Sequence, residues 1–200
     1  MSTCVLVTPL AQNIPFIEDA DYIGVDAGCL RILEQNLSLC YAIGDFDSMD
    51  ENQLEQIKQI CEVEIHPVMK DETDSELAIR KFYNQYDKVI LFGGIKGRLD
   101  HTLLNISLLV KRYPKVILMD ETQKVILLKK GKHILSSDYK NVSFFVLEES
   151  EISLNGFLYE LDHRHVSDND LYLTSNSFVE QQGVVNVYEG CLLCVQSNEK

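Results

Sequence analysis

Short apolar segments alternate with longer amphipathic segments over the first 120 residues of this 200-residue chain. The apolar segments have the length and composition of strands, and they cover residues 4–8, 22–25, 39–43, 63–67, 88–92 and 115–119. The segments between them have a helical pattern, at residues 28–36, 49–60, 74–85 and 99–111. Strands that alternate with helices of this length predict βαβ units, and therefore an α/β fold with a Rossmann-like, mostly parallel sheet.

Two capping boxes sharpen the expected helix starts. Ser48-x-x-Glu51 and Thr73-x-x-Glu76 each place a hydroxyl residue three positions before a glutamate, which is the pattern that closes the first turn of a helix. We therefore expect Ser48 and Thr73 to precede the second and third helices.

The pattern changes after Asp120. No amphipathic helix is evident there, and Asn155-Gly156 and Glu189-Gly190 are the clearest turn signals. The strand candidates are short, at residues 123–129, 132–135, 142–147, 151–154, 157–161, 170–174, 184–188 and 191–196. We therefore predict an α/β domain over residues 1–122, followed by a small C-terminal antiparallel β-sandwich over residues 123–200.

Charge and hydropathy exclude several classes of protein. The formal net charge is −13, and the excess falls within residues 1–76, which hold 16 acidic and 3 basic side chains. This balance disfavours binding to nucleic acid or to anionic lipid, both of which need clustered Lys and Arg. No segment approaches the roughly 20 apolar residues that span a bilayer, and the N-terminus lacks the basic region of a signal peptide. We therefore expect a cytoplasmic protein without nucleic-acid or membrane partners.

Cysteine usage does not indicate a metal or redox site. Cys191-Leu-Leu-Cys194 lies in a strand-like segment without a second CxxC pair. An odd separation along a strand places the two thiols on opposite faces of the sheet, so we expect them to be structural.

Acidic residues follow the predicted strands of the first domain at regular places. In a parallel sheet the carboxyl ends of the strands share one edge, and ligands bind in the crevice outside it. Carboxylates gathered there repel one another unless a cation neutralises them, and oxygen ligands without nearby Cys or His favour Mg²⁺. These residues are Asp26, Asp45, Asp47, Asp71, Asp74 and Asp100.

A glycine-rich segment at the same edge has the chemistry of a phosphate site. Gly93, Gly94 and Gly97 allow backbone N–H groups to approach an anion at the start of a helix, and Arg98 adds a fork of donors. There is no GxxxxGK[ST] or GxGxxG motif. Each piece alone is common in turns and caps, but their coincidence at one edge favours a nucleotide-using phosphoryl or pyrophosphoryl transferase.

The same residues, in the same order, resemble the thiamine pyrophosphokinase family, of the bacterial type. The resemblance rests on Asp26-Ala-Gly, Gly44-Asp-Phe-Asp-Ser48, Lys70-Asp-Glu-Thr-Asp-Ser-Glu76, Gly93-Gly-x-x-Gly-Arg-Leu-Asp100-His and Thr174-Ser-Asn176. It implies pyrophosphoryl transfer from ATP to the hydroxyl of thiamine, which gives thiamine diphosphate and AMP. It also implies a homodimer, with thiamine bound between the first domain of one subunit and the sandwich of the other.

The resemblance further implies a role for each residue of these motifs. Mg²⁺ would be held by Asp45, Asp47 and Asp74, and thiamine would be contacted by Lys70, Ser175 and Asn176. Asp71 and Asp100 would join the three metal ligands as catalytic residues. ATP would be bound by Asp26, Thr73, Gly93, Gly94, Gly97, Arg98 and Asn105.

Two alternatives remain open from the residues alone. An apolar strand followed by Asp45-Phe-Asp47 is also the pattern of a haloacid-dehalogenase-type, Mg²⁺-dependent phosphohydrolase, in which Asp45 would be the nucleophile. A nucleotide-sensing module without catalysis would need the phosphate site but not this many carboxylates.

Overall fold

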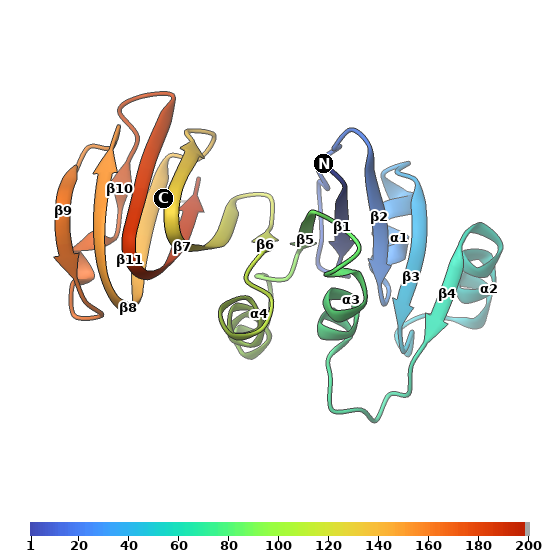
Figure 1. Cartoon of the computed structure of the whole chain (residues 1–200). Helices are drawn as coiled ribbons and strands as arrows, with labels where there is room; N and C mark the ends of the chain where they lie inside the picture. The colour runs from blue at the N-terminus through green and yellow to red at the C-terminus, as the bar shows by residue number, and fades with distance from the viewer. Residues whose placement is uncertain (199–200) are drawn as a thin grey trace. The chain divides into compact units, whose positions relative to one another are not determined.

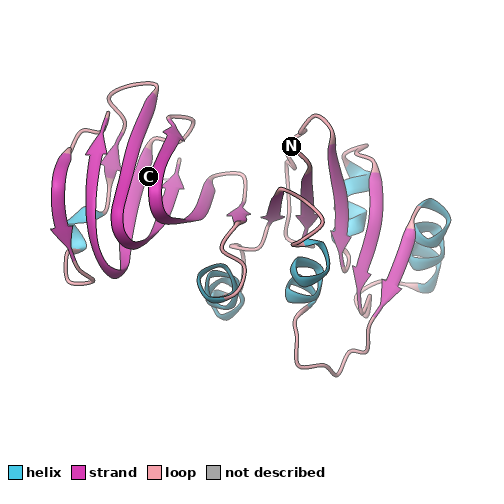
Figure 2. Cartoon of the chain, in the orientation of Figure 1, coloured by secondary structure: helices cyan, strands magenta, loops and turns pink. Residues whose placement is uncertain are grey.

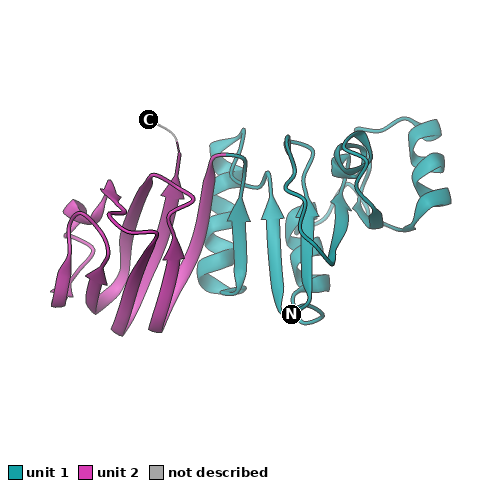
Figure 3. Ribbon diagram, turned by 90° about the horizontal axis from the view of Figure 1, so that it is seen from above, with its two compact units in different colours: residues 1–121 teal, residues 122–200 magenta. Residues whose placement is uncertain are grey.

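The chain consists of two compact units, and each is described by itself. The computed structural model describes residues 1–198. The units are Met1–Glu121 and Thr122–Lys200, so the division lies one residue before the boundary expected from the sequence (Figure 3).

The first unit is built on a six-stranded parallel sheet in the order β6-β5-β1-β2-β3-β4. Its strands are β1 (Thr3–Val7), β2 (Ala20–Val25), β3 (Leu39–Gly44), β4 (Glu62–Ile65), β5 (Lys88–Phe92) and β6 (Val116–Met119). The chain moves outward from β1 to β4 and then returns to the other side of β1 with β5. The strand order therefore reverses between β1 and β5, which is where open parallel sheets bind ligands.

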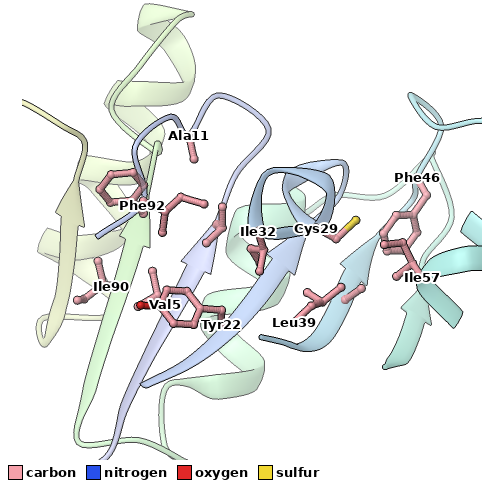
Figure 4. Close-up of a cluster of buried hydrophobic side chains, with 13 residues drawn as sticks. Val5, Ala11, Tyr22, Cys29, Ile32, Leu39, Phe46, Ile57, Ile90 and Phe92 are labelled. Carbon is pink, nitrogen blue, oxygen red and sulfur yellow. The ribbon is translucent and has the colours of Figure 1, made fainter. Parts of the chain in front are cut away.

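Helices cover both faces of this sheet (Figure 1). The four helices are α1 (Gly28–Glu34), α2 (Glu51–Ile60), α3 (Asp74–Phe82) and α4 (Leu99–Lys111). Helix α1 packs on β1, β2 and β3, and its Ile32 meets Val5 and Phe92 in one buried cluster (Figure 4). Alternate residues such as Leu6 point to the other face, where α3 packs across β1, β2, β3 and β5.

The helix starts agree with the predicted caps at one position and differ at the other. Thr73 caps α3, because its Oγ1 accepts a hydrogen bond from the Glu76 backbone N–H at 3.3 Å. Helix α2 is instead capped by Asp50, which forms a reciprocal capping box with Gln53. The prediction of Ser48 was therefore wrong. Ser48 donates a hydrogen bond to the Asp26 carboxylate at 3.2 Å, so a tertiary contact takes the hydroxyl away from the helix.

The second unit is an antiparallel sheet built on three long strands. Strand β11 lies between β7 and β8, and both β9 and β10 pair with β8. The bounds are β7 (Gln123–Ser136), β8 (Asn141–Asn155), β9 (Leu161–Val166), β10 (Asn176–Ser177) and β11 (Gln182–Ser197). Both ends of each long strand contribute to one buried core; β8, for example, supplies Phe144 from one end and Leu154 from the other.

The predicted short strands of the second unit are mostly halves of these long strands. Glu189-Gly190 is a bulge inside β11 and not a turn: the register shifts on both sides of it, and Gly190 has φ 85°. The Ser150 hydroxyl accepts a hydrogen bond from the Cys191 N–H at 3.1 Å, which holds the bulge. Residues 170–174 are not a strand either, because Leu171–Leu173 form a 3₁₀ turn, the one helical segment described in this unit (Figure 2).

Cys191 and Cys194 lie on opposite faces of β11, as their odd spacing predicted. Cys194 lies in the core of the second unit, whereas Cys191 does not belong to that core.

Among the described residues, no helix has the length and apolar composition needed to cross a bilayer.

The corrected cap of α2 leads to a stability prediction. Asp50→Ala should lower the free energy of unfolding by about 1 kcal/mol, because the backbone N–H of Gln53 loses the Asp50 carboxylate that accepts its hydrogen bond. Asp50→Asn is the matched control: it keeps a side-chain acceptor at the cap and should leave the stability nearly unchanged. Urea unfolding followed by circular dichroism would compare the two variants, and an equal loss in both would contradict the assignment of the cap.

Candidate functional site

A cleft of about 540 Å³ lies at the carboxyl ends of the strands in the first unit. Each segment that lines it follows a strand: Thr8, Pro9 and Leu10 come after β1, Asp26 after β2 and Asp45 after β3. The connection from β4 to α3 supplies Val68, Lys70, Glu72, Thr73, Asp74 and Ser75. The segment after β5 supplies Gly93, Gly94, Lys96, Gly97, Arg98, His101 and Asn105. The cleft therefore lies where the strand order reverses.

Three carboxylates form a cluster at one side of the cleft: Asp26 and Asp45 line the cleft, and the exposed Asp47 lies beside them. Ligand oxygens of Asp26, Asp45 and Asp47 all lie within 4.8 Å of one another. Asp26 is held there by its backbone, which donates to the Ile43 carbonyl at 2.8 Å and has φ 50°. Gly44 permits this approach, since a Cβ at that position would lie 2.9 Å from the Asp26 backbone. The ends of β2 and β3 are thus held close enough to bring the carboxylates together.

Lys70 joins this cluster to Asp74. Its Nζ lies 2.6 Å from Asp45 Oδ2 and 3.2 Å from Asp74 Oδ1, and all three side chains are largely buried. Burial acts to raise the pKa of Asp45, but the hydrogen bond and charge of Lys70 together with hydrogen bonds from Asp47 outweigh burial and hold that pKa below its ordinary value. Burial likewise acts to lower the pKa of Lys70, and its two carboxylate partners hold it above the ordinary value. Lys70 is therefore a firmly charged ammonium between two carboxylates.

Asp26 is electrostatically different from Asp45. Burial raises its pKa above the ordinary value, although hydrogen bonds from the Ala27 backbone and from Ser48 oppose the shift. Its Oδ1 is buried without a hydrogen-bond partner. A buried carboxylate oxygen without a partner is costly, so this atom is suited to meet a cation.

The other side of the cleft is glycine-rich and basic. Gly93 (φ 85°) and Gly97 (φ 77°) have left-handed backbone conformations, which favour glycine. The buried Asn105 donates from Nδ2 to the Gly94 carbonyl at 2.6 Å and so holds the segment onto α4. Arg98 forms a two-bond ion pair with Asp100, and Lys96 pairs with Glu121. One side of the cleft thus carries the carboxylates with Lys70, and the other side carries the glycine-rich segment with Lys96 and Arg98. A phosphate chain with a bound cation requires both kinds of group.

The structure places the remaining predicted residues of the first unit less centrally. Asp71 is exposed and does not line the cleft. Asp100 is exposed and does not line the cleft; it contacts two cleft residues, Arg98 through an ion pair and His101 through its backbone N–H. Thr73 lines the cleft but uses its hydroxyl to cap α3. The sequence prediction missed Thr8, Lys96 and His101, which also line the cleft; Thr8 could have been found from its place directly after the first strand.

Ser175 and Asn176 lie in the second unit. Ser175 is exposed, has φ 60° and donates its backbone N–H to the Ser143 hydroxyl at 3.0 Å. Asn176 is buried, and its amide group bonds to both the N–H and the carbonyl of Tyr159. Its Oδ1 also accepts from the Ser177 N–H at 2.9 Å. The Ser175 hydroxyl is thus presented to solvent, whereas the side chain of Asn176 holds the segment before β9.

The carboxylate cluster fits a hard divalent cation. Its ligands are all oxygens, it includes a buried Asp26 oxygen without a partner, and it faces a cleft large enough for phosphates and water. The set differs from the one expected from the sequence: Asp26 joins Asp45 and Asp47, while Asp74 faces the same region across Lys70.

Removing the Lys70 ammonium should produce a pH-dependent loss of stability. In Lys70→Met without metal, the free energy of unfolding at pH 7 should fall by about 2–3 kcal/mol, because Asp45 and Asp74 remain ionised without a counter-charge. In the wild type, the lowered pKa of Asp45 contributes stability above the ordinary aspartate range, and this stability is lost as pH falls.

The difference between wild type and Lys70→Met should therefore shrink as pH falls from the ordinary aspartate range, about pH 4, toward the lowered pKa of Asp45. Urea unfolding in EDTA from pH 7 to pH 3 would measure it. The exposed Lys111→Met is the control. A difference that stays constant with pH would show that Lys70 acts through packing alone.

Comparison with known proteins agrees with this geometry in both units. Residues 16–119 match the family model of the thiamin pyrophosphokinase catalytic domain, and residues 128–192 match that of the thiamin pyrophosphokinase vitamin B1 binding domain. A thiamine pyrophosphokinase of Bacillus subtilis is 30% identical over 187 residues, covering 89% of this chain and 87% of the relative.

Solved structures of similar proteins share the fold over nearly their whole length. The crystal structure of thiamine pyrophosphokinase from Bacillus subtilis has a TM-score of 0.87 at 28% identity, covering 99% of this chain and 100% of that chain. The structure of thiamin pyrophosphokinase from Geobacillus thermodenitrificans has a TM-score of 0.84 at 29% identity, covering 100% and 98%.

Proposed function

The chain belongs to the thiamine pyrophosphokinase family, and on this premise we propose that its cleft transfers the pyrophosphoryl group of ATP to the hydroxyl of thiamine. The observation that supports this most is the division of the cleft into a carboxylate side, with Asp26, Asp45 and Asp47, and a basic glycine-rich side. In the reaction, the thiamine oxygen forms a bond to the β-phosphorus of ATP. The bond between that phosphorus and the oxygen bridging to the α-phosphorus breaks, and AMP leaves.

In this proposal the chain's own residues position the phosphates and stabilise their charge. Asp26, Asp45 and Asp47 would hold Mg²⁺, with Asp74 beside them; the ion supplies neutralisation of phosphate charge. Backbone N–H groups from Gly94 to Gly97 approach the phosphate oxygens from the other side, whereas the Gly93 N–H is held by the Met119 carbonyl.

Side chains at the cleft complete the arrangement. Arg98 and Lys96 add positive charge on the phosphate side, and Asn105 keeps the glycine segment in place. We further propose that Lys70 moves from the carboxylates toward the phosphates or thiamine once the metal arrives. A cleft carboxylate accepts the proton of the thiamine hydroxyl.

For the thiamine side, we propose a homodimer in which the second domain contributes Ser175 to the binding of thiamine. The match of residues 128–192 to a vitamin B1 binding domain supports this role, as does the exposed hydroxyl of Ser175. Asn176 would act indirectly, by holding Tyr159. The family membership does not support the two alternatives, a phosphohydrolase with an Asp45 nucleophile and a sensor without catalysis.

The product formed from ATP distinguishes pyrophosphoryl transfer from other reactions of the nucleotide. Incubation of the protein with ATP, Mg²⁺ and thiamine should release AMP and thiamine diphosphate in equal amounts, which chromatography and mass spectrometry measure. Omission of thiamine is the control and should abolish AMP release. ADP or free phosphate as the product would contradict pyrophosphoryl transfer, and a phosphoaspartate trapped at Asp45 would support the phosphohydrolase.

Removal of one metal ligand should separate catalysis from folding. Asp45→Asn should lower kcat/KM by at least about 100-fold. The metal site loses one of the negative charges that hold the cation, and the cation neutralises the phosphates. Asp19→Asn is a matched control: Asp19 is exposed with φ 57°, a conformation that asparagine tolerates. Steady-state kinetics and circular dichroism would be measured for both, and near wild-type activity of Asp45→Asn would exclude Asp45 from the site.

A change in the second domain should affect thiamine more than ATP. Ser175→Ala should raise the KM for thiamine about 5- to 10-fold, which is the loss of one hydrogen bond, with little change in the KM for ATP. Ser167→Ala, in the same domain, serves as the control for general effects. A larger effect on ATP than on thiamine would argue against Ser175 as a thiamine contact.

A further inference from the structure

Thr8 is a buried polar residue at the cleft that has no role in the fold or in the reaction as described so far. It follows β1 directly, is 6% exposed, and its Oγ1 has no hydrogen-bond partner. Buried hydroxyls are normally paired, because leaving one unpaired destabilises the folded protein. Thr8 also lines the cleft, so a ligand bound there lies beside this residue.

The backbone around Thr8 is fixed on both sides. Its N–H donates to the Phe92 carbonyl at 3.0 Å, and its carbonyl accepts from the Ala11 N–H at 3.1 Å. The hydroxyl also lies directly beside Gly93: a Cβ built on that glycine would be 2.4 Å from Thr8 Oγ1. Any side chain at position 93 would displace the hydroxyl, so Thr8 and Gly93 form one surface at the reversal point between β1 and β5.

The position of the Thr8 hydroxyl suits a ligand atom that accepts a hydrogen bond. The ionised carboxylates of Asp26, after the neighbouring strand β2, and of Asp45, after β3, can only accept hydrogen bonds, and the Lys70 ammonium beside them is bound to Asp45 and Asp74. The Gly93 segment on the other side presents backbone N–H groups. A neutral hydroxyl between the two regions can donate to a phosphate oxygen without competing for the cation.

We propose that the Thr8 hydroxyl binds the nucleotide by donating a hydrogen bond to a phosphate oxygen of ATP at the reversal point of the sheet. This inference rests on the proposed function, since it assumes that the nucleotide phosphates lie in this cleft. It assigns a binding role to a residue outside the motifs that carry the resemblance, and it explains why a buried hydroxyl is left without a partner inside the protein.

The test compares two replacements of Thr8 by isothermal titration calorimetry with ATP and Mg²⁺. Thr8→Val keeps the shape but removes the donor, and should weaken ATP binding about 10- to 100-fold, as expected for one hydrogen bond to a charged group. Thr8→Ser keeps the donor and should bind ATP within about 3-fold of the wild type. Thr3→Val, at the other end of the same strand, is the matched control and should change nothing.

Two further measurements separate binding from a structural role. Without nucleotide, Thr8→Val should melt at or above the wild-type temperature, because it removes an unpaired buried hydroxyl. Adenosine, which lacks phosphates, should bind Thr8→Val and the wild type equally. A lowered melting temperature with weak binding of both ligands would overturn the proposal in favour of a packing role.

The remaining outcomes are equally decisive. Unchanged ATP affinity in Thr8→Val would overturn the proposal while leaving the function of the protein intact. An equal loss of affinity for adenosine would overturn the assignment to phosphate. Failure of the wild type itself to bind ATP would instead count against the proposed function, so the two failures are distinguishable.

Discussion

Repulsion among like charges is the constraint that shapes the first unit. A parallel sheet brings the ends of β2, β3 and β4 to one edge, and each of these ends supplies a carboxylate to the cleft. Without a cation, Asp45 and Asp74 would push the β3 and β4 connections apart. The Lys70 ammonium lies between them, so the cleft has an internal counter-charge. The same geometry that is suited to a metal is thus compatible with a folded protein before metal binds.

The architecture of the first unit could be predicted from the sequence, because short apolar strands and longer amphipathic helices differ in the spacing of their apolar residues. The sequence also placed acidic residues at the strand ends, and topology alone then brought most of them to one cleft. It could not distinguish Ser48 from Asp50 as the cap of α2, since both precede a glutamate or glutamine by three residues. Only the tertiary contact of Ser48 with Asp26 decides between them.

The second unit was harder to predict because glycine with positive φ serves both turns and bulges. Gly156 follows the end of β8 and Gly190 lies inside β11, yet each follows a polar residue in the sequence.

The roles of single polar residues could not be read from the sequence either. Asn176 follows Ser175 in a motif, but burial commits its amide to the backbone. Thr8 belongs to no motif; its place directly after the first strand could have indicated it, but its burial without a partner is evident only in the structure.

The pairing of β1 with β5 has a consequence for how the first unit forms. Val5 pairs with Ile90, so the two central strands are far apart in the sequence while β1 to β4 associate with their neighbours along the chain. Contacts at such separation require closure of a long loop and form slowly. The cleft is bounded by segments that follow both β1 and β5. During synthesis, a nascent chain that has not yet emerged beyond Phe92 therefore has the carboxylates of the cleft but lacks the glycine-rich segment that faces them.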